Sequence, residues 1–200
     1  MIPVGITQRL LPPDEFGERR SALDVRWPRL LARCGLAAVP LPPDETLAVA
    51  VAEAASVAGL LLSGGEDLAR YGGPAPERDA AERALLDWAL RTGRPVLGVC
   101  RGMQVVVDRF GGVLHPVDGH VAARHEVAVD GRSRMVTCYH RWAARAVPDP
   151  CTVTARRGDV VEAVRLTGTR VHGIMWHPER EDPPDEADLA MIRSVLGGAR

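Results

Sequence analysis

The first 110 residues alternate between short apolar runs and longer amphipathic stretches. Short apolar runs bounded by turn-forming residues are typical of strands buried in a parallel sheet, and an apolar stripe with helical spacing is typical of a helix that covers such a sheet. The predicted strands are residues 2–7, 36–41, 59–63 and 96–99, and the predicted helices are 17–34, 47–57, 80–91 and a segment that begins after Cys100. This alternation predicts an α/β fold whose mainly parallel sheet carries helices on both faces.

The clearest amphipathic pattern lies in residues 17–34. A helix over this range would place its apolar side chains on one face and would end at Gly35, a residue that readily adopts the left-handed conformation of a helix C-terminus. The apolar face would carry Leu23, Trp27, Leu30, Leu31 and Cys34.

After Phe110 the pattern changes to closely spaced β-type runs, followed by one last helix. The runs are residues 125–129, 135–139, 151–156, 160–166 and 170–176, and the helix is 186–196. Their short connections predict an antiparallel hairpin or meander added to the parallel sheet. Because no repeat, linker or low-complexity segment divides the chain, we expect a single domain over residues 1–200.

Composition narrows the functional class only a little. The formal net charge of the 200 residues is −1, and all 25 basic residues other than histidine are arginine, so arginine clusters carry little information here. We expect neither a nucleic-acid partner nor a membrane partner, and we expect no signal peptide. The four cysteines show no metal-type spacing, so free thiols and a cytoplasmic location are expected: Cys34, Cys100, Cys138 and Cys151.

The strongest chemical signal is a cysteine in the turn between a strand and a helix. Gly98 and Gly102 flank Cys100 at two residues on either side, which allows the tight backbone path of a nucleophile elbow. The positive end of the following helix would lower the pKa of the thiol from ~8.5 and favour the thiolate. Without other signals, a buried and inert cysteine is an equally good interpretation of Cys100.

Two further strand ends carry residues that complete a hydrolase. Ligands of open α/β sheets bind at the carboxyl ends of the strands, where the sequence places a Gly64-Gly65 pair and a His177-Pro-Glu179 segment. If these ends meet, Cys100 is the nucleophile, His177 the base and later the acid, and Glu179 the residue that orients the imidazole. The oxyanion hole would be the backbone N–H groups of Gly65 and Arg101.

Each of these signals has a simpler interpretation when it is taken alone. A His-Pro-Glu segment is most often only a loop. His115, His120 and His125 recur every five residues, which fits neither a helix face nor an alternating strand, so we expect core or loop histidines and no metal site. The joint occurrence of the three strand ends is what favours catalysis, and the proposed reaction needs no metal or organic cofactor.

Four segments together resemble a known family: residues 61–68 (LLSGGEDL), 95–104 (PVLGVCRGMQ), 139–140 (YH) and 173–179 (GIMWHPE). They resemble the class I glutamine amidotransferase-like superfamily, and within it the γ-glutamyl-γ-aminobutyrate hydrolase type of γ-glutamyl hydrolases. The resemblance implies a flavodoxin-like fold and a Cys-His-Glu triad at Cys100, His177 and Glu179. Short stretches near both ends, including residues 5–9, also look like γ-glutamyl-CDP-amidate hydrolases of surface-polysaccharide modification.

The same resemblance implies which residues contact the glutamyl group. Gln104 matches the family glutamine near that group, and Gly64 lies in the oxyanion loop. The segment at Thr137, Cys138, Tyr139 and His140 stands where the family often has Asn-Ser-Tyr-His, next to the glutamyl α-carboxylate and α-amine. This departure leaves open whether the usual recognition of that end is preserved.

We therefore expect hydrolysis of a γ-glutamyl amide to glutamate and a free amine through a cysteine thioester. One alternative is a glutaminase subunit that supplies ammonia to a separate synthase partner. Against this alternative, the Cys-Arg-Gly segment at Cys100 resembles the hydrolase branch, since amidotransferases tend to have an uncharged residue after the nucleophile. Another alternative is a catalytically silent binding protein on the same fold. The expected partner is a small γ-glutamyl substrate, and a homo-oligomer is left open.

Overall fold

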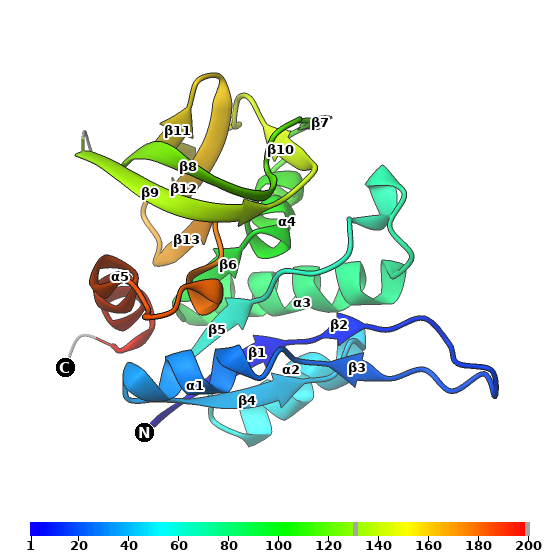
Figure 1. Cartoon of the computed structure of the whole chain (residues 1–200). Helices are drawn as coiled ribbons and strands as arrows, with labels where there is room; N and C mark the ends of the chain where they lie inside the picture. The colour runs from blue at the N-terminus through cyan, green and yellow to red at the C-terminus, as the bar shows by residue number, and fades with distance from the viewer. Residues whose placement is uncertain (130–131, 199–200) are drawn as a thin grey trace.

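The computed structural model describes residues 1–129 and 132–198, and within them nine strands form one mixed sheet (Figure 1). Across the sheet the strands are β4 (Leu36–Leu41), β1 (Ile2–Thr7), β5 (Gly59–Leu62), β6 (Val96–Val99), β13 (Val171–Ile174), β12 (Val160–Leu166), β11 (Cys151–Arg157), β8 (Val121–Val129) and β9 (Arg132–Tyr139). The first five are mutually parallel and the others pair antiparallel. The predicted fold class is therefore confirmed.

The parallel half follows the flavodoxin-like order, in which the chain moves outward from its first strand in both directions. The second parallel strand, β4, pairs on one side of β1, and β5, β6 and β13 follow on the other side. The direction of winding reverses between β1 and β5, and ligands of such sheets bind at the carboxyl ends beside this point. The topology therefore brings the residues after β5, β6 and β13 to one edge of the sheet.

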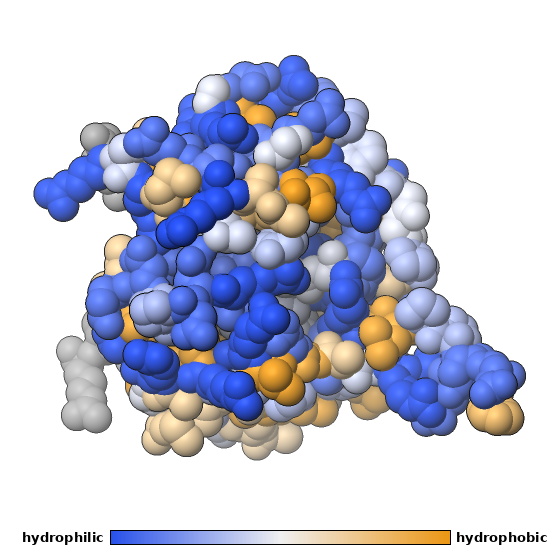
Figure 2. Space-filling view, viewed as in Figure 1, coloured by the Kyte–Doolittle hydropathy of each residue, from blue (hydrophilic) through white to orange (hydrophobic). Residues whose placement is uncertain are grey.

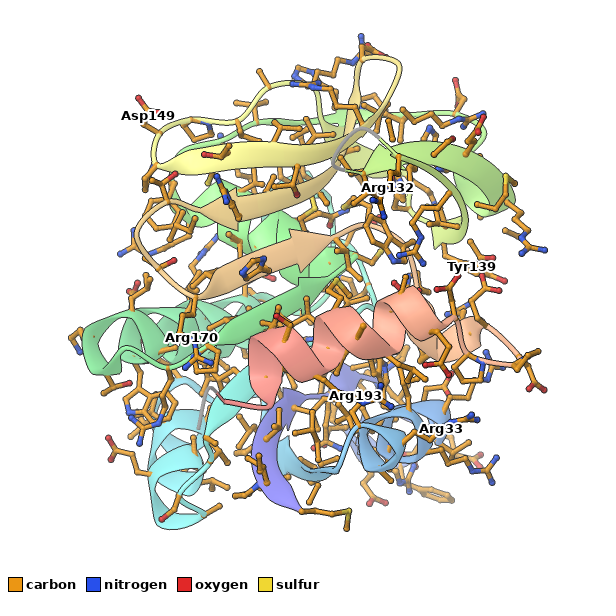
Figure 3. All side chains as sticks on the ribbon, turned by 90° about the vertical axis from the view of Figure 1, so that its left-hand side faces the viewer. Arg33, Arg132, Tyr139, Asp149, Arg170 and Arg193 are labelled. Atoms are coloured by element: carbon orange, nitrogen blue, oxygen red, sulfur yellow. The ribbon has the colours of Figure 1, made fainter. Side chains whose placement is uncertain are left out.

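Helices cover both faces of the parallel strands because the side chains of each strand alternate in direction. In β5, Leu60 and Leu62 pack with the helices on one face, whereas Leu61 packs with those on the other face. The first face is covered by α2 (Glu45–Ala54), α3 (Pro76–Thr92) and α4 (Arg101–Arg109), and the second by α1 (Arg26–Arg33) and α5 (Glu186–Leu196). On the second face α1 and α5 lie side by side, and Arg193 donates a hydrogen bond of 3.1 Å to the carbonyl of Arg33 (Figure 3).

The antiparallel strands form a curved extension above the parallel half (Figure 1). The predicted late strands are all present, and β8 and β9 are longer than predicted. A small separate pair, β7 (Leu114–Pro116) with β10 (Trp142–Ala144), joins the extension to α4 through contacts with that helix and with β12. The extension therefore continues the sheet beyond β13, on the side away from β4.

The predicted helix over residues 17–34 is wrong in its first half. The helix begins only at Arg26, and before it β2 (Arg9–Leu10) pairs with β3 (Ser21–Ala22). Pro28 explains the late start, because in a longer helix its ring would clash with the carbonyl of residue 24 and its nitrogen could not donate to that group. The chain between β2 and β3 instead forms an arm, residues 11–20, that projects from the body (Figure 1).

Hydrophilic residues cover most of the face of the molecule that Figure 2 shows. The apolar residues on this face form small separate groups, and one of them is at the arm, where Phe16 is 87% exposed. In the described part of the chain, no helix is both long and apolar enough to cross a bilayer.

Candidate active site

The turn between β6 and α4 holds Cys100 in a strained backbone conformation. Its φ is +53° and its ψ is −104°, a region that residues with a Cβ rarely adopt. The turn requires glycine at two positions. A Cβ on Gly98 would lie 2.6 Å from the backbone of Gly102, and a Cβ on Gly102 would lie 2.1 Å from the carbonyl oxygen of Leu62, so any larger residue would clash. Strain of this kind costs about 1–3 kcal/mol and persists only where surrounding packing enforces it. The geometry is that of a nucleophile elbow.

The loop after β5 approaches the elbow closely. A Cβ on Gly64 would lie 2.7 Å from Cε1 of His177, so only glycine leaves room for the imidazole there. The same Cβ would be 3.7 Å from the Cβ of Cys100, an ordinary contact distance. Gly65 follows with a φ of +156°, and any side chain on it would collide with Arg78. The two glycines therefore place the backbone of this loop directly beside Cys100.

His177 reaches the same place from the end of β13. It precedes η2 (Pro178–Arg180), a short turn that brings Glu179 back toward the imidazole, and Nδ1 of His177 lies 2.7 Å from Oε1 of Glu179. Both side chains are buried, at 4% and 3% exposure. Nε2 of His177 has no hydrogen-bond partner among the described residues. This nitrogen can therefore carry a proton and exchange it with a group bound next to Cys100.

The charge state of His177 depends on its neighbours. Burial by itself lowers its pKa, but the negative charge of a Cys100 thiolate and that of Glu179 outweigh burial and raise the pKa to about 10. His177 therefore carries a proton at neutral pH when Cys100 is ionised. A thiolate–imidazolium pair of this kind is both a nucleophile and a proton donor.

A cleft of about 700 Å³ opens over these residues. Its floor includes Cys100 and His177, and its walls come from the loop after β5, from the residues that follow η1 (Ala69–Tyr71), and from the base of the arm. Three arginines reach it: Arg9, Arg141 and Arg180. Four carboxylates also line it: Asp24, Glu66, Asp67 and Glu179. The cleft is therefore large enough for a small molecule and has a lining of mixed charge.

A buried ionic network lies beneath the cleft. Arg78 is 1% exposed; its Nη2 donates to the carbonyl oxygens of Ser63 (2.9 Å) and Gly64 (3.1 Å), and its Nε donates to Glu82 (2.9 Å). The side chain of Arg101, the residue after Cys100, pairs with Glu82 and Asp79. Burial and the nearby positive charge of Arg78 lower the pKa of Arg101, and Asp79 opposes this shift. One helix, α3, thereby anchors both the glycine loop and the elbow.

Only some of the predicted substrate-binding residues line the cleft. Tyr139 lines the cleft, and its ring stands edge-on to His177 at 5.5 Å between centroids, with the guanidinium of Arg180 over the tyrosine ring at 3.8 Å. Gly64 also lines the cleft. Gln104 instead donates to the carbonyl of Trp142 (2.9 Å), and Thr137 donates to Glu181. Substrate contact by Gln104 and Thr137 stays a prediction.

Cys138 and His140 do not line the cleft. Both are buried, and they lie near Glu162 on β12. His120 and His125 join them there, so these two histidines lie in the core as predicted, whereas His115 is exposed on β7.

Sequence reasoning missed the ionic network. Arg78 and Asp79 precede the predicted start of the helix at residue 80, and Glu82 has the pattern of an ordinary surface residue. The spacing of four residues between Arg78 and Glu82 could have indicated a pair on one helix face. It could not have shown that this face is buried.

Comparison with known proteins finds a matching family and several relatives. A family model described as peptidase C26 matches residues 4–127 and 118–179. The chain is 28% identical over 183 residues to the gamma-glutamyl-CDP-amidate hydrolase of Campylobacter jejuni, with 90% of each protein covered. It is 31% identical over 154 residues to the gamma-glutamyl-gamma-aminobutyrate hydrolase of Escherichia coli, covering 62% of this chain and 59% of that enzyme.

Relatives with another role are also similar. The chain is 33% identical over 131 residues to one subunit of the glutamine-hydrolysing GMP synthase of Methanoregula boonei, covering 60% of this chain and 65% of that protein. A crystal structure of a protein from Thermoplasma acidophilum, described as a candidate GMP synthase component, superimposes with a TM-score of 0.73 at 18% identity over 98% of this chain and 93% of that one. The structural match concerns the fold alone.

The ionic network predicts that removal of two different carboxylates on α3 will lower the free energy of unfolding by different amounts. Glu82→Ala leaves Arg78 and Arg101 buried without their shared partner, so the free energy of unfolding should fall by about 3–5 kcal/mol. Asp87→Ala removes an exposed pair with Arg109 and should cost less than about 1 kcal/mol. Chemical denaturation of both variants measures the difference, and equal losses would contradict the structural role of Glu82.

The pairing of His177 with Glu179 predicts a shift in titration. Because Glu179 raises the pKa of His177, Glu179→Gln should lower it from about 10, and the imidazolium should then be lost at a lower pH as the pH rises. Nitrogen-15 NMR of the histidine rings measures this directly. The control is Glu181→Gln, which changes a nearby carboxylate that accepts a hydrogen bond from Thr137. This variant should leave the pKa of His177 unchanged. Identical titration of His177 in all three proteins would refute the assignment.

Proposed function

Because the chain belongs to the peptidase C26 family of class I glutamine amidotransferase-like proteins, we propose that it is a cysteine hydrolase that cleaves γ-glutamyl amides. The observation that carries this proposal is the convergence of three strand ends on Cys100. His177 adjoins Cys100 with a free Nε2 while its Nδ1 is held by Glu179 at 2.7 Å. Relatives named as hydrolases of γ-glutamyl compounds support the substrate class.

The first half of the reaction forms a thioester. The Cys100 thiolate attacks the γ-carbonyl carbon of the substrate, and the carbonyl oxygen becomes an oxyanion. His177 then gives its Nε2 proton to the nitrogen of the departing amine as the C–N bond breaks. Glu179 keeps the imidazole oriented and stabilises its positive charge.

The second half releases glutamate. Nε2 of His177, now without its proton, accepts a proton from water, and the resulting hydroxide equivalent attacks the thioester carbon. The C–S bond breaks, Cys100 leaves as the thiolate, and His177 is again protonated. The pair thus returns to the charge state in which it began.

The oxyanion would be stabilised by the backbone N–H groups of Gly65 and Arg101. Arg101 is the first residue of α4, so its N–H has no acceptor within the helix, and it lies at the positive end of the helix dipole. Each donor of this kind contributes roughly 100–1,000-fold in rate. The ionic network supports both positions, since Arg78 holds the Ser63–Gly64 carbonyls and Glu82 holds the Arg101 side chain.

The rim of the cleft supports a leaving amine that carries negative charge. Arg141 is exposed, lines the cleft and has no carboxylate partner among the described residues. Arg9 and Arg180 are paired with carboxylates of the same cleft, Glu66 and Glu179, so Arg141 is the arginine that remains for an anionic group. A phosphorylated amine would suit this rim, because guanidinium groups bind phosphate in a bidentate manner. The relative from Campylobacter jejuni is named for such a compound, a CDP-amidate.

The alternative is a glutaminase subunit of an amidotransferase. The relatives that are GMP synthase subunits favour it. The chemistry at Cys100 would be the same, with glutamine as the substrate and ammonia passed to a synthase partner. The two functions therefore differ in the amine released and in dependence on a partner.

A panel of amides separates these functions. The purified protein should release glutamate from γ-glutamyl amines and little ammonia from glutamine, and Cys100→Ala should abolish the release. The control is Cys34→Ala, which changes a half-buried cysteine between α1 and α5 and should leave activity intact. Coupled assays for glutamate and for ammonia give both rates.

Strong ammonia release from glutamine, or activity only when a synthase is added, would favour the glutaminase role instead. Undiminished activity of Cys100→Ala would refute the mechanism.

Arg141 predicts a selective effect on substrate binding. Arg141→Ala should raise KM roughly 10- to 150-fold for a γ-glutamyl amide of a phosphorylated amine, since one charge-assisted hydrogen bond contributes about 1.5–3 kcal/mol. The KM for an uncharged amine should not change, nor should kcat. Arg145→Ala is the control, because this nearby exposed arginine pairs with Asp159 and does not line the cleft. Equal effects on both substrates would contradict anion recognition by Arg141.

A further inference from the structure

A second group of chemically active side chains lies behind β9, apart from the cleft. It contains three histidines, a cysteine and a carboxylate, all of them 5% exposed or less, and we call it the histidine cluster: His120, His125, Cys138, His140 and Glu162. These residues come from β8 and the residue preceding it, from the end of β9 and the residue following it, and from β12. The proposed mechanism uses none of them as a reacting group.

The donor atoms of the cluster converge on the carboxylate of Glu162. Its Oε1 lies 3.1 Å from Nδ1 of His120 and 3.3 Å from Nε2 of His125. Its Oε2 lies 3.6 Å from Sγ of Cys138 and 3.7 Å from Nε2 of His140. The sulfur is also 3.5 Å from Nε2 of His125, which joins the two halves.

Hydrogen bonds account for only part of this arrangement, such as the contact of the Cys138 thiol with Oε2 of Glu162. Nδ1 of His120, both ring nitrogens of His140 and Oε1 of Glu162 are buried and have no aligned hydrogen-bond partner among the described residues. Buried polar atoms of native proteins are nearly always paired, because an unpaired one costs about 1–3 kcal/mol. Several unpaired atoms gathered around one carboxylate therefore point to a partner that they would share.

The spacing fits a transition-metal ion. Zinc binds nitrogen and oxygen at about 2.0–2.1 Å and sulfur at about 2.3 Å, usually with four ligands at the corners of a tetrahedron, which places neighbouring ligand atoms about 3.3–3.6 Å apart. The five distances lie at or near these values, and they belong to two groups that share Glu162, one with His120 and His125 and one with Cys138 and His140; within each group the ligand atoms lie within 4.8 Å of one another. Imidazole, thiolate and carboxylate together are the ligands that zinc takes from proteins.

From this geometry we propose that the histidine cluster binds one divalent transition-metal ion of the zinc class. Glu162 and Cys138 supply two of the four ligands, and two of the three histidines supply the others. The Cys138 thiol gives up its proton to solvent as the metal–sulfur bond forms, so the net charge added by the ion is reduced by one.

Arg157 is the cation that stands nearest to this site among the described residues. Its Nη1 lies 3.4 Å from Nε2 of His120 and from Nδ1 of His125, the ring nitrogens that face away from Glu162. On metal binding those nitrogens carry the protons, and Arg157, on an exposed position of β11, turns into solvent. The outer N–H groups then resemble the outward-facing ring nitrogens of other metal-bound histidines.

The site would stabilise the part of the extension that touches His177. Cys138 pairs with Trp176 through a backbone bridge, the carbonyl of Thr137 accepts the backbone N–H of His177 (3.0 Å), and the ring of Tyr139 lies against the imidazole. An ion that joins β8, β9 and β12 would hold this segment in place. Its role is structural, because the cluster does not line the cleft.

The test is a metal titration of the Cys100→Ala protein, in which the thiol of the cleft cannot bind the ion. After chelator treatment, the protein should bind one equivalent of Zn²⁺ or Co²⁺, and Co²⁺ should give the visible absorption of a tetrahedral site with thiolate charge transfer. Saturation with Zn²⁺ at about a hundredfold excess over Kd should raise Tm by roughly 5–10 °C.

Two variants in the same background locate the site. Glu162→Gln should weaken binding by at least about 100-fold, since even the loss of an outer partner costs 10–100-fold, and it should abolish the rise in Tm. Cys138→Ser should remove the thiolate band, which keeps the proposal testable if Glu162→Gln does not fold. The control, His115→Ala, changes an exposed histidine outside the cluster and should bind as the parent does.

Failure to bind a stoichiometric ion would overturn the proposal. Binding that survives Glu162→Gln unchanged, or a cobalt spectrum that Cys138→Ser does not alter, would overturn it as well. None of these readouts measures activity, so the outcome is independent of the proposed hydrolysis.

Discussion

The buried ion pairs between Arg78, Glu82 and Arg101 are the constraint on which the candidate site depends. They fasten two separate pieces of backbone, the glycine loop after β5 and the turn after β6, to the same helix. A buried ion pair contributes little net stability compared with an apolar packing of the same volume, but removal of one partner is strongly destabilising. The network therefore acts mainly to position the backbone, because the two proposed oxyanion donors, Gly65 and Arg101, lie in the glycine loop and in the turn after β6.

The strained conformation of Cys100 follows from the same arrangement. A φ of +53° is unfavourable for a cysteine, and it is held because Gly98, Gly102 and Leu62 approach too closely for any wider turn. The parallel sheet supplies the rigid frame for this contact, since β5 and β6 are neighbours and both end at this edge. A side chain placed at a rigid strand end is positioned more precisely than one placed on a loop.

The antiparallel extension contributes the rest of the candidate site and connects it to a second group of buried ligand-type residues. β13 leads into His177 in the parallel half, and β9 contacts it from the extension through Thr137 and Tyr139. On the other side of β9, Cys138 and His140 face Glu162. One strand thus faces His177 on one side and the histidine cluster on the other, so any change in the cluster reaches His177 through a single backbone segment.

The sequence by itself determined the order and type of most elements, the mainly parallel sheet, and the residues at three strand ends, because these depend on local periodicity and on short motifs such as the one around Cys100. It also contained Pro28, which accounts for the late start of α1. Only the tertiary structure decided that Arg78 and Glu82 are buried, and that Glu162, a single acidic residue in the apolar run of β12, meets three histidines and a cysteine. Such contacts join residues far apart in the chain, and local patterns carry no record of which distant side chains will share a buried space.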